Sequence, residues 1–188
     1  MKICLYKYFW YVKTLLKKFR FGHIGKKSYI GPRGIFLGTK KVFIGNEVRI
    51  YPGVRLEAYE DGKIKIEDDV SIGQNFHCTA RDELVIGAHS TILGNVFITD
   101  MDHDYQEIGV HILKQKCIVK QTHIGENCFI GYGAAIQAGT KLGKQCVVGA
   151  NAVVRGEFPD YSVIVGAPAK IVKKYNVESG KWERVAHE

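Results

Sequence analysis

The chain has 188 residues, of which 46% are hydrophobic and four are proline, and its formal net charge is +8. This length allows one domain with a substantial core, and this composition is typical of a globular protein rather than a disordered one. Six of the basic residues lie in the first 22 positions, which contain no acid. A nucleic-acid-binding surface would place the excess charge on the folded body, so we expect no nucleic-acid partner.

The first predicted element is an amphipathic helix over residues 1–22. At about 100° per residue its cations cover one arc and its apolar and aromatic side chains the other, as in helices that lie in a membrane interface. The cations are Lys2, Lys7, Lys13, Lys17, Lys18 and Arg20. Such a helix could equally cover the open end of a repetitive fold, so membrane contact through residues 1–20 and a capping role both stay open. Charges recur throughout the segment and no small-residue cleavage site follows, which argues against a signal peptide.

Aliphatic residues recur every sixth position through most of the remaining chain. The runs begin at Ile24, Ile44, Ile66, Ile86 and Ile118, and the last continues without a slip to Val154. A period of six fits neither a helix nor a simple alternating strand, and it is the signature of a parallel β-helix. One inward aliphatic side chain per six residues builds continuous ladders through stacked coils. The sequence therefore predicts an all-β solenoid over residues 23–174.

Three segments interrupt this repeat, at residues 37–43, 57–65 and 99–117. A solenoid extrudes its insertions as loops, often on the binding face. The longest insertion has the densest group of titratable side chains in the chain, namely Asp100, Asp102, His103, Asp104 and Glu107. After Val154 the repeat stops, and we expect a partial coil, a basic segment and a C-terminal tail over residues 175–188.

The five cysteines form no CxxC or zinc-type pattern. An odd number of cysteines without a secretory signal favours a reducing compartment. We therefore expect a cytoplasmic protein, peripheral at the inner face of the membrane if the first helix binds there.

The repeat, the His-containing loop and the sequence VIVGAPAKIVKK near the C-terminal end resemble the hexapeptide-repeat acyltransferases. The similarity covers about residues 24–174, and it is greatest to sugar O-acetyltransferases of the galactoside, maltose, O-antigen or capsule type. It implies a left-handed coil, a homotrimer, acetyl-CoA as acyl donor, a sugar or glycan hydroxyl as acceptor, and no metal.

The resemblance also implies roles for single residues. Asn95 and Val96 lead to His103 at the family's spacing, and His103 keeps the second histidine of a DHDH motif that here is DMDH, so it would be the catalytic residue. In the stretch NFH, where the family has NFN, Asn75 and His77 would bind the acceptor, although His77 departs from the family's pattern. Asp100 and Asp102 would position His103 or the sugar. The family's CoA groove maps to Tyr132, Gly149, Ala150, Arg155, Lys170 and Lys173, with Arg155 in place of the family's lysine.

This chemistry suits the residue types. Imidazole titrates near neutral pH, so His103 could accept a hydroxyl proton, a contribution of about 10²- to 10⁴-fold in rate. The phosphates of CoA call for cations, which Arg155, Lys170 and Lys173 could supply.

Two alternatives have different requirements. A zinc carbonic anhydrase-like β-helix enzyme needs three histidine ligands, and His103 and His111 lack the family's close spacing. A non-enzymatic β-helix assembly module would bind no CoA and gives no reason for the His103 loop.

Overall fold

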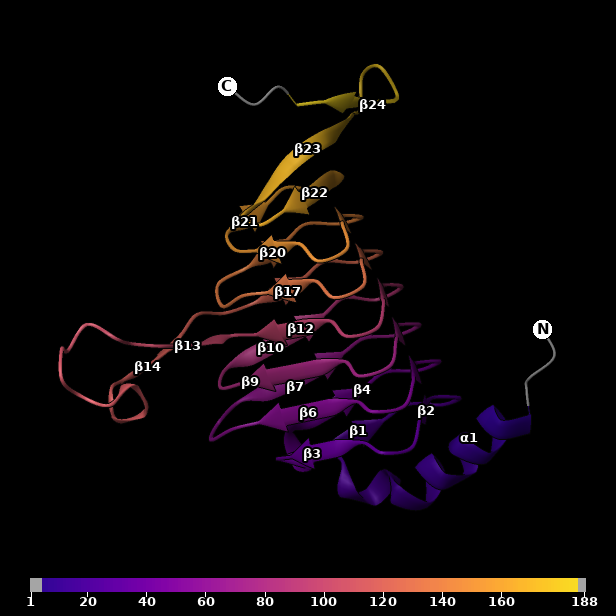
Figure 1. The fold of residues 1–188 in the computed structure, drawn as a ribbon. Coiled ribbons are helices and arrows are strands. Elements are labelled where there is room, and N and C mark those ends of the chain that lie inside the picture. The colour runs from indigo at the N-terminus through magenta and orange to yellow at the C-terminus, as the bar shows by residue number, and fades with distance from the viewer. Residues whose placement is uncertain (1–4, 186–188) are drawn as a thin grey trace.

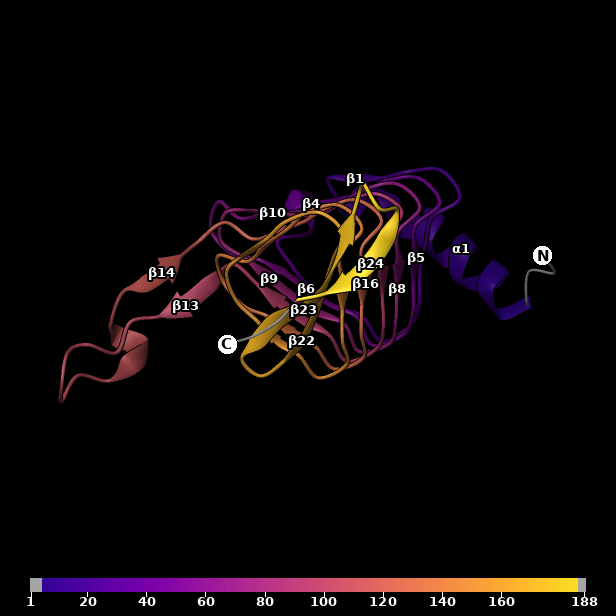
Figure 2. The same cartoon turned by 90° about the horizontal axis from the view of Figure 1, so that it is seen from above.

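The computed structural model describes residues 5–185, which form a parallel β-solenoid with one α-helix at its N-terminal end (Figure 1). Viewed along its axis, the solenoid has three sides (Figure 2). Each side is one sheet, and successive coils add one strand to each sheet. The predicted parallel β-helix is therefore confirmed.

The strands of the three sheets have the following bounds. The first sheet contains β1 (His23–Ile24), β4 (Val42–Ile44), β7 (Lys63–Ile66), β10 (Glu83–Ile86), β15 (His123–Ile124), β18 (Lys141–Leu142) and β21 (Glu157–Phe158). The second contains β2 (Tyr29–Ile30), β5 (Arg49–Ile50), β8 (Ser71–Ile72), β11 (Thr91–Ile92), β16 (Phe129–Ile130), β19 (Val147–Val148), β22 (Ser162–Gly166), β23 (Ala169–Asn176) and β24 (Lys181–Arg184). The third contains β3 (Ile35–Leu37), β6 (Arg55–Ala58), β9 (His77–Ala80), β12 (Phe97–Thr99), β17 (Ala135–Ile136) and β20 (Val153–Val154).

The ladders of the core follow the six-residue period. In the first sheet the register places Ile24, Ile44, Ile66, Ile86 and Ile124 one above another, and all five side chains are buried. Burial of such a side chain stabilises the fold by about 1.5–3 kcal/mol. The solenoid is thus held together by stacked aliphatic contacts between neighbouring coils.

The corners between sheets need a left-handed backbone. One column of corners contains Gly53, Asn75, Asn95, Gly133 and Asn151, all with positive φ. Glycine adopts this conformation at no steric cost, and asparagine tolerates it better than most residues. At Gly53 a Cβ atom would lie 2.3 Å from the side-chain oxygen of Asn75, so the close approach of two coils also requires glycine there.

The interruptions of the repeat differ in kind. Residues 37–43 form a 3₁₀ turn (Thr39–Lys41) and the start of β4. Residues 57–65 lengthen β6 and β7 and join them by a short turn at 59–62. Only the third insertion leaves the solenoid, as an antiparallel ribbon of β13 (Met101–His103) and β14 (Cys117–Val119) with a 3₁₀ turn (Ile112–Lys114) near its tip (Figure 1).

Ile118 lies in this ribbon and not in the core. It pairs with Asp102, and the backbone N–H of Lys120 closes the base of the ribbon by donating to the Asp100 carbonyl at 2.8 Å. The next strand of the solenoid, β15, begins only at His123, so the prediction that the last unbroken run begins at Ile118 is wrong.

The first helix, α1 (Leu5–Lys17), continues into a 3₁₀ turn (Lys18–Arg20) and packs beside β2 at the first coil. Residues 1–4, with the predicted helix position Lys2, lie outside the described residues. Within residues 5–185 no helix has the length and apolar character that a membrane span requires.

At the other end, β22 is followed by the antiparallel strands β23 and β24. The expected tail therefore begins inside β23 and includes β24.

Candidate active site

The root of the ribbon is fixed by the buried carboxylate of Asp100. Its side chain is 0% exposed, and its two oxygens accept hydrogen bonds from the backbone N–H groups of Arg81, at 2.9 and 3.0 Å, and Asp82, at 2.8 Å. Burial raises the pKa of Asp100 above its usual value, while these N–H groups act in the opposite direction. Asp100 therefore has a structural role at the root of the ribbon, and its acceptor-binding role stays a prediction.

His103 lies on the outer part of β13 and is exposed. Across the ribbon it pairs with Cys117. Opposite residues of an antiparallel pair project from the same face, with Cβ atoms about 5 Å apart. The imidazole is thus presented on a narrow ribbon that projects away from the solenoid (Figure 2), free to meet a substrate.

Asp102 and Arg155 tie the ribbon to a later coil. The Arg155 Nη2 atom donates to Asp102 Oδ2 at 2.7 Å, and its Nε atom donates to Gln137 Oε1 at 2.9 Å. The other Asp102 oxygen accepts from the backbone N–H of His103 at 3.0 Å. The Arg155 hydrogen bond is the main reason that the pKa of Asp102 lies below its usual value. Arg155 was assigned to CoA from the sequence, and here its guanidinium supports the residue beside His103.

Asn75 and His77 lie near the start of β9. Asn75 occupies a left-handed corner, and its Nδ2 atom donates to Asn95 Oδ1 at 3.0 Å. The Asn95 amide in turn donates to the hydroxyl of Tyr132. Asn75 therefore has a structural role in a ladder of corner side chains, and its acceptor-binding role stays a prediction.

His77 belongs to a polar cluster that the sequence analysis missed. Its Nε2 atom lies 3.1 Å from Glu57 Oε2, and its ring packs against Phe97. The nearly buried Glu57 also accepts from Arg55 Nη2 at 2.8 Å, which is the main cause of its lowered pKa. The register that stacks Arg55, His77 and Phe97 follows from the period of the coils, so counting one coil ahead would have revealed the cluster.

Most of the residues predicted to hold CoA share one edge of the solenoid. Tyr132 and Ala150 lie at equivalent corners of successive coils, where the backbone N–H of Asn151 donates to the Tyr132 carbonyl at 2.8 Å. A Cβ atom on Gly149 would lie 2.9 Å from Val165 Cγ1. Val165 pairs with Lys170, and Val163, two residues earlier on the same strand, pairs with Lys173. The structure therefore groups Tyr132, Gly149, Ala150, Lys170 and Lys173 and places Arg155 in a different environment.

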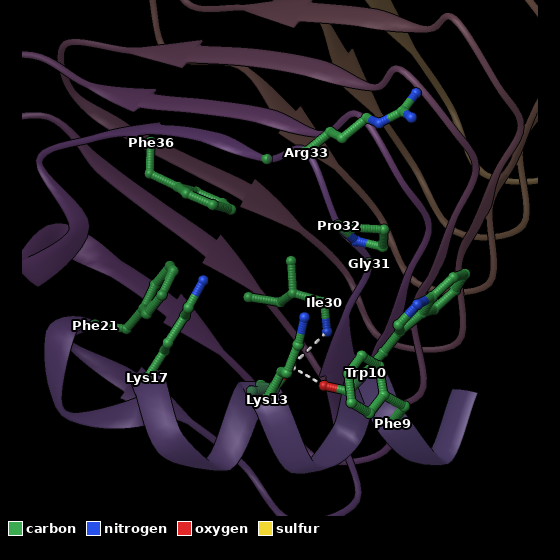
Figure 3. Close-up of a pocket in the computed structure, with 12 residues that line it drawn as sticks. Phe9, Trp10, Lys13, Lys17, Phe21, Ile30, Gly31, Pro32, Arg33 and Phe36 are labelled. Carbon is green, nitrogen blue, oxygen red and sulfur yellow. Dashed lines mark hydrogen bonds between the residues drawn. The ribbon is translucent and has the colours of Figure 1, made fainter. Parts of the chain in front are cut away.

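A cavity of about 370 Å³ lies at the opposite end of the molecule, between α1 and the first coil (Figure 3). None of the predicted site residues lines it. Within residues 5–185 no three His, Cys, Asp or Glu side chains form a group that could hold a metal ion. The candidate site is therefore an open one, formed by the exposed His103 ribbon and the C-terminal edge of the coils.

Comparison with known proteins gives relatives of one kind. A family model described as the hexapeptide repeat of succinyl-transferase matches residues 121–155. A protein of Escherichia coli (strain K12) named as a lipopolysaccharide biosynthesis O-acetyl transferase, WbbJ, is 35% identical over 143 residues, which span 70% of this chain and 71% of that protein. A Mycobacterium tuberculosis protein named as an acetyltransferase, Rv3034c, is 35% identical over 143 residues, 76% of this chain but 46% of that protein.

Solved structures share the fold at low identity. A variant of AntD, an N-acyltransferase from Bacillus cereus in complex with dTDP-4-amino-4,6-dideoxyglucose and coenzyme A, has a TM-score of 0.76 at 18% identity, over 89% of this chain and 90% of that one. A galactoside acetyltransferase in complex with coenzyme A has a TM-score of 0.60 at 18% identity, over 95% and 87% of the two chains. These likenesses match the left-handed β-helix expected from the sequence. With the relationship to WbbJ, they show that this chain belongs to the hexapeptide-repeat acyltransferase family.

Proposed function

We propose that the protein is an acetyl-CoA-dependent O-acetyltransferase that acylates a hydroxyl of a sugar or glycan precursor, with His103 as general base. The observation that carries the proposal is the exposed His103 on a ribbon whose root and middle are held by Asp100 and by the Asp102–Arg155 pair. The name of the WbbJ relative supports the acceptor class.

In this proposal the neutral imidazole of His103 accepts the proton of the acceptor hydroxyl. The hydroxyl oxygen then attacks the thioester carbonyl carbon, and the C–S bond breaks as the tetrahedral intermediate collapses. The CoA sulfur leaves as a thiolate and takes up the proton from the imidazolium. A backbone N–H group of a rigid coil is suited to stabilise the oxyanion, because it needs no rearrangement during the reaction.

The donor would lie along the edge formed by Tyr132, Gly149 and Ala150. Tyr132 and Ala150 are exposed at this edge and Gly149 has no side chain, so an extended ligand could reach backbone groups there. Lys170 and Lys173 are exposed on β23 and would hold phosphates of CoA, since ammonium groups bind phosphate as point charges.

The active form in this proposal is a homotrimer. In one chain the ribbon exposes a group of apolar side chains at its outer part, Tyr105, Ile108, Ile112 and Leu113. Exposed apolar groups of this kind favour an interface. Flat solenoid faces can pack around a threefold axis, and the ribbon could then complete a site against the coils of its neighbour. Light scattering at micromolar concentration tests this, and a monomeric mass would contradict it.

The decisive test of the proposed chemistry is acetyl transfer by His103→Ala, once an acceptor has been found by a screen with acetyl-CoA and a thiol-release readout. We expect unchanged folding and CoA affinity and a rate lower by about 10²-fold or more, the range for a removed proton acceptor. His123→Ala is the matched control, because His123 is also exposed but lies on the first sheet. If His103→Ala keeps a rate within about threefold of the parent, His103 is not the base.

A further inference from the structure

The helix α1 turns its apolar side away from the rest of the protein. Leu5 is 87% exposed, Leu16 71% and Phe19, in the following turn, 75%. Tyr8, Val12 and Leu15 are exposed as well and follow the same spacing of three and four residues. An amphipathic helix of a globular protein normally buries this side against the core. Here the usual orientation is reversed.

The reversed orientation is fixed by contacts on the opposite side of the helix. Thr14 is buried, and its hydroxyl accepts a hydrogen bond from the backbone N–H of Ile30 at 2.9 Å. The Trp10 ring packs against Tyr29 and Tyr51, and Lys7 Nζ donates to the Tyr51 hydroxyl at 2.9 Å. Rolling the helix to bury its apolar side would break all of these contacts. The exposed face is therefore a stable feature of the fold.

Cations lie next to the exposed face, around the cavity between α1 and the first coil. Figure 3 shows the amines of Lys13 and Lys17 directed toward this cavity, which Arg33 borders from the coil. Phe21, Ile30 and Phe36 contribute apolar walls, and no acid lines the cavity. Within residues 5–185 none of the three cations forms a salt bridge. Lys13 Nζ lies over the Phe9 ring, 4.4 Å from its centroid, and this contact does not neutralise the amine. The charges are thus available to an external anion.

We propose that α1 docks on an anionic lipid bilayer, with its apolar face in the interface and with Lys13 and Lys17 binding lipid phosphate groups. Apolar and aromatic side chains on one face, with lysines beside them, are the features by which interfacial helices bind membranes. Each cation near an anionic surface adds to the attraction. A second copy of the chain fits less well, because it would bring one helix without acidic residues against another of the same charge.

Capping and membrane binding are then functions of two different sides of one helix. The side with Thr14 and Trp10 covers the first coil, and the side with Leu5, Leu16 and Phe19 meets the lipid. This proposal does not depend on the transferase activity, although it would place that activity beside membrane-bound acceptors.

Flotation with vesicles tests the proposal on the full chain. Vesicles of phosphatidylcholine mixed with phosphatidylglycerol should bind the protein, and raising the salt concentration should weaken the binding. The double variant Leu16→Gln/Phe19→Gln should bind at least about tenfold more weakly, since two exposed apolar groups no longer enter the interface. Val177→Gln is the matched control, because Val177 is 77% exposed in the C-terminal part of the chain, and its binding should be unchanged.

The cations are tested separately. Lys13→Gln and Lys17→Gln should each weaken binding to the anionic vesicles by about fivefold and leave binding to phosphatidylcholine alone unchanged. Absence of binding by the parent, or equal binding by the parent and Leu16→Gln/Phe19→Gln, would overturn the proposal. A drop in oligomer mass of that double variant, without any vesicle binding by the parent, would instead identify a second copy as the occupant.

Discussion

Replacing Asp100 by alanine distinguishes a structural carboxylate from a substrate ligand. The substitution removes the only side chain that accepts from the backbone N–H groups of Arg81 and Asp82 among the described contacts. An unsatisfied buried donor costs about 1–3 kcal/mol, so two cost at most about 2–6 kcal/mol, and this is an upper limit because Arg81 is half-buried and Asp82 is exposed. Burial disfavours the charged carboxylate, as its raised pKa indicates, and this offsets part of the loss. We therefore expect the free energy of unfolding to fall by about 2–4 kcal/mol.

Urea unfolding followed by circular dichroism, at one fixed protein concentration and neutral pH, measures this difference. Fixed concentration matters because assembly would add to the apparent stability. Glu107→Ala is the control, because Glu107 is an exposed acid in the same insertion, and its free energy of unfolding should change by less than about 0.5 kcal/mol. If Asp100→Ala has the same free energy of unfolding as the Glu107→Ala control but a higher KM for the acceptor, Asp100 is a substrate ligand and its structural assignment fails.

Three further outcomes are expected. Arg155→Ala, which removes a half-exposed ion pair, should change stability by less than about 1 kcal/mol but should speed limited proteolysis of residues 100–120; an unchanged cleavage rate would contradict the tether. Arg55 lowers the pKa of Glu57 in the folded protein. The ionised Glu57 therefore stabilises the fold at pH values above its ordinary pKa of about 4, and this stabilisation is lost as the pH falls through the lower folded-state pKa. Glu57→Gln should reduce the dependence of the free energy of unfolding on pH in this acid range. Gly53→Ala should lower the melting temperature more than Gly109→Ala, because both glycines have φ near +80° but only Gly53 has a coil within contact distance; equal shifts would show that backbone strain alone decides.

The coils could be predicted from the sequence because one physical requirement repeats. Each sixth side chain must point inward, so the positions of Ile44, Ile66 and Ile86 in the sequence predict the register of their strands. The same rule misplaced Ile118. This residue lies six positions before Ile124 and so fits the period, although it belongs to the ribbon and not to a coil. Only the pairing of β14 with β13 shows where the coil ends.

The candidate site was predictable in part. The insertion located His103, because titratable side chains gathered there. The partner of Asp102 could not be found in this way, since Arg155 is 53 residues away and meets it only through the register of the coils. The burial of Asp100 was equally hidden, because a run of aspartates in a loop is usually solvated, and only the turn at Arg81 and Asp82 supplies the N–H groups that draw this carboxylate inward.

The change from parallel to antiparallel pairing at β22 and β23 limits growth of the stack. A parallel solenoid that ended on a bare coil would offer unpaired N–H and C=O groups to the next molecule and could polymerise end to end. Here the hairpin that follows covers the edge of β22 along Ser162–Gly166 with a strand of opposite direction, and a register shift between Val163 and Ile164 breaks its regularity. A chain cut before Ala169 would lose this cover, and its last coil would become a template for fibres.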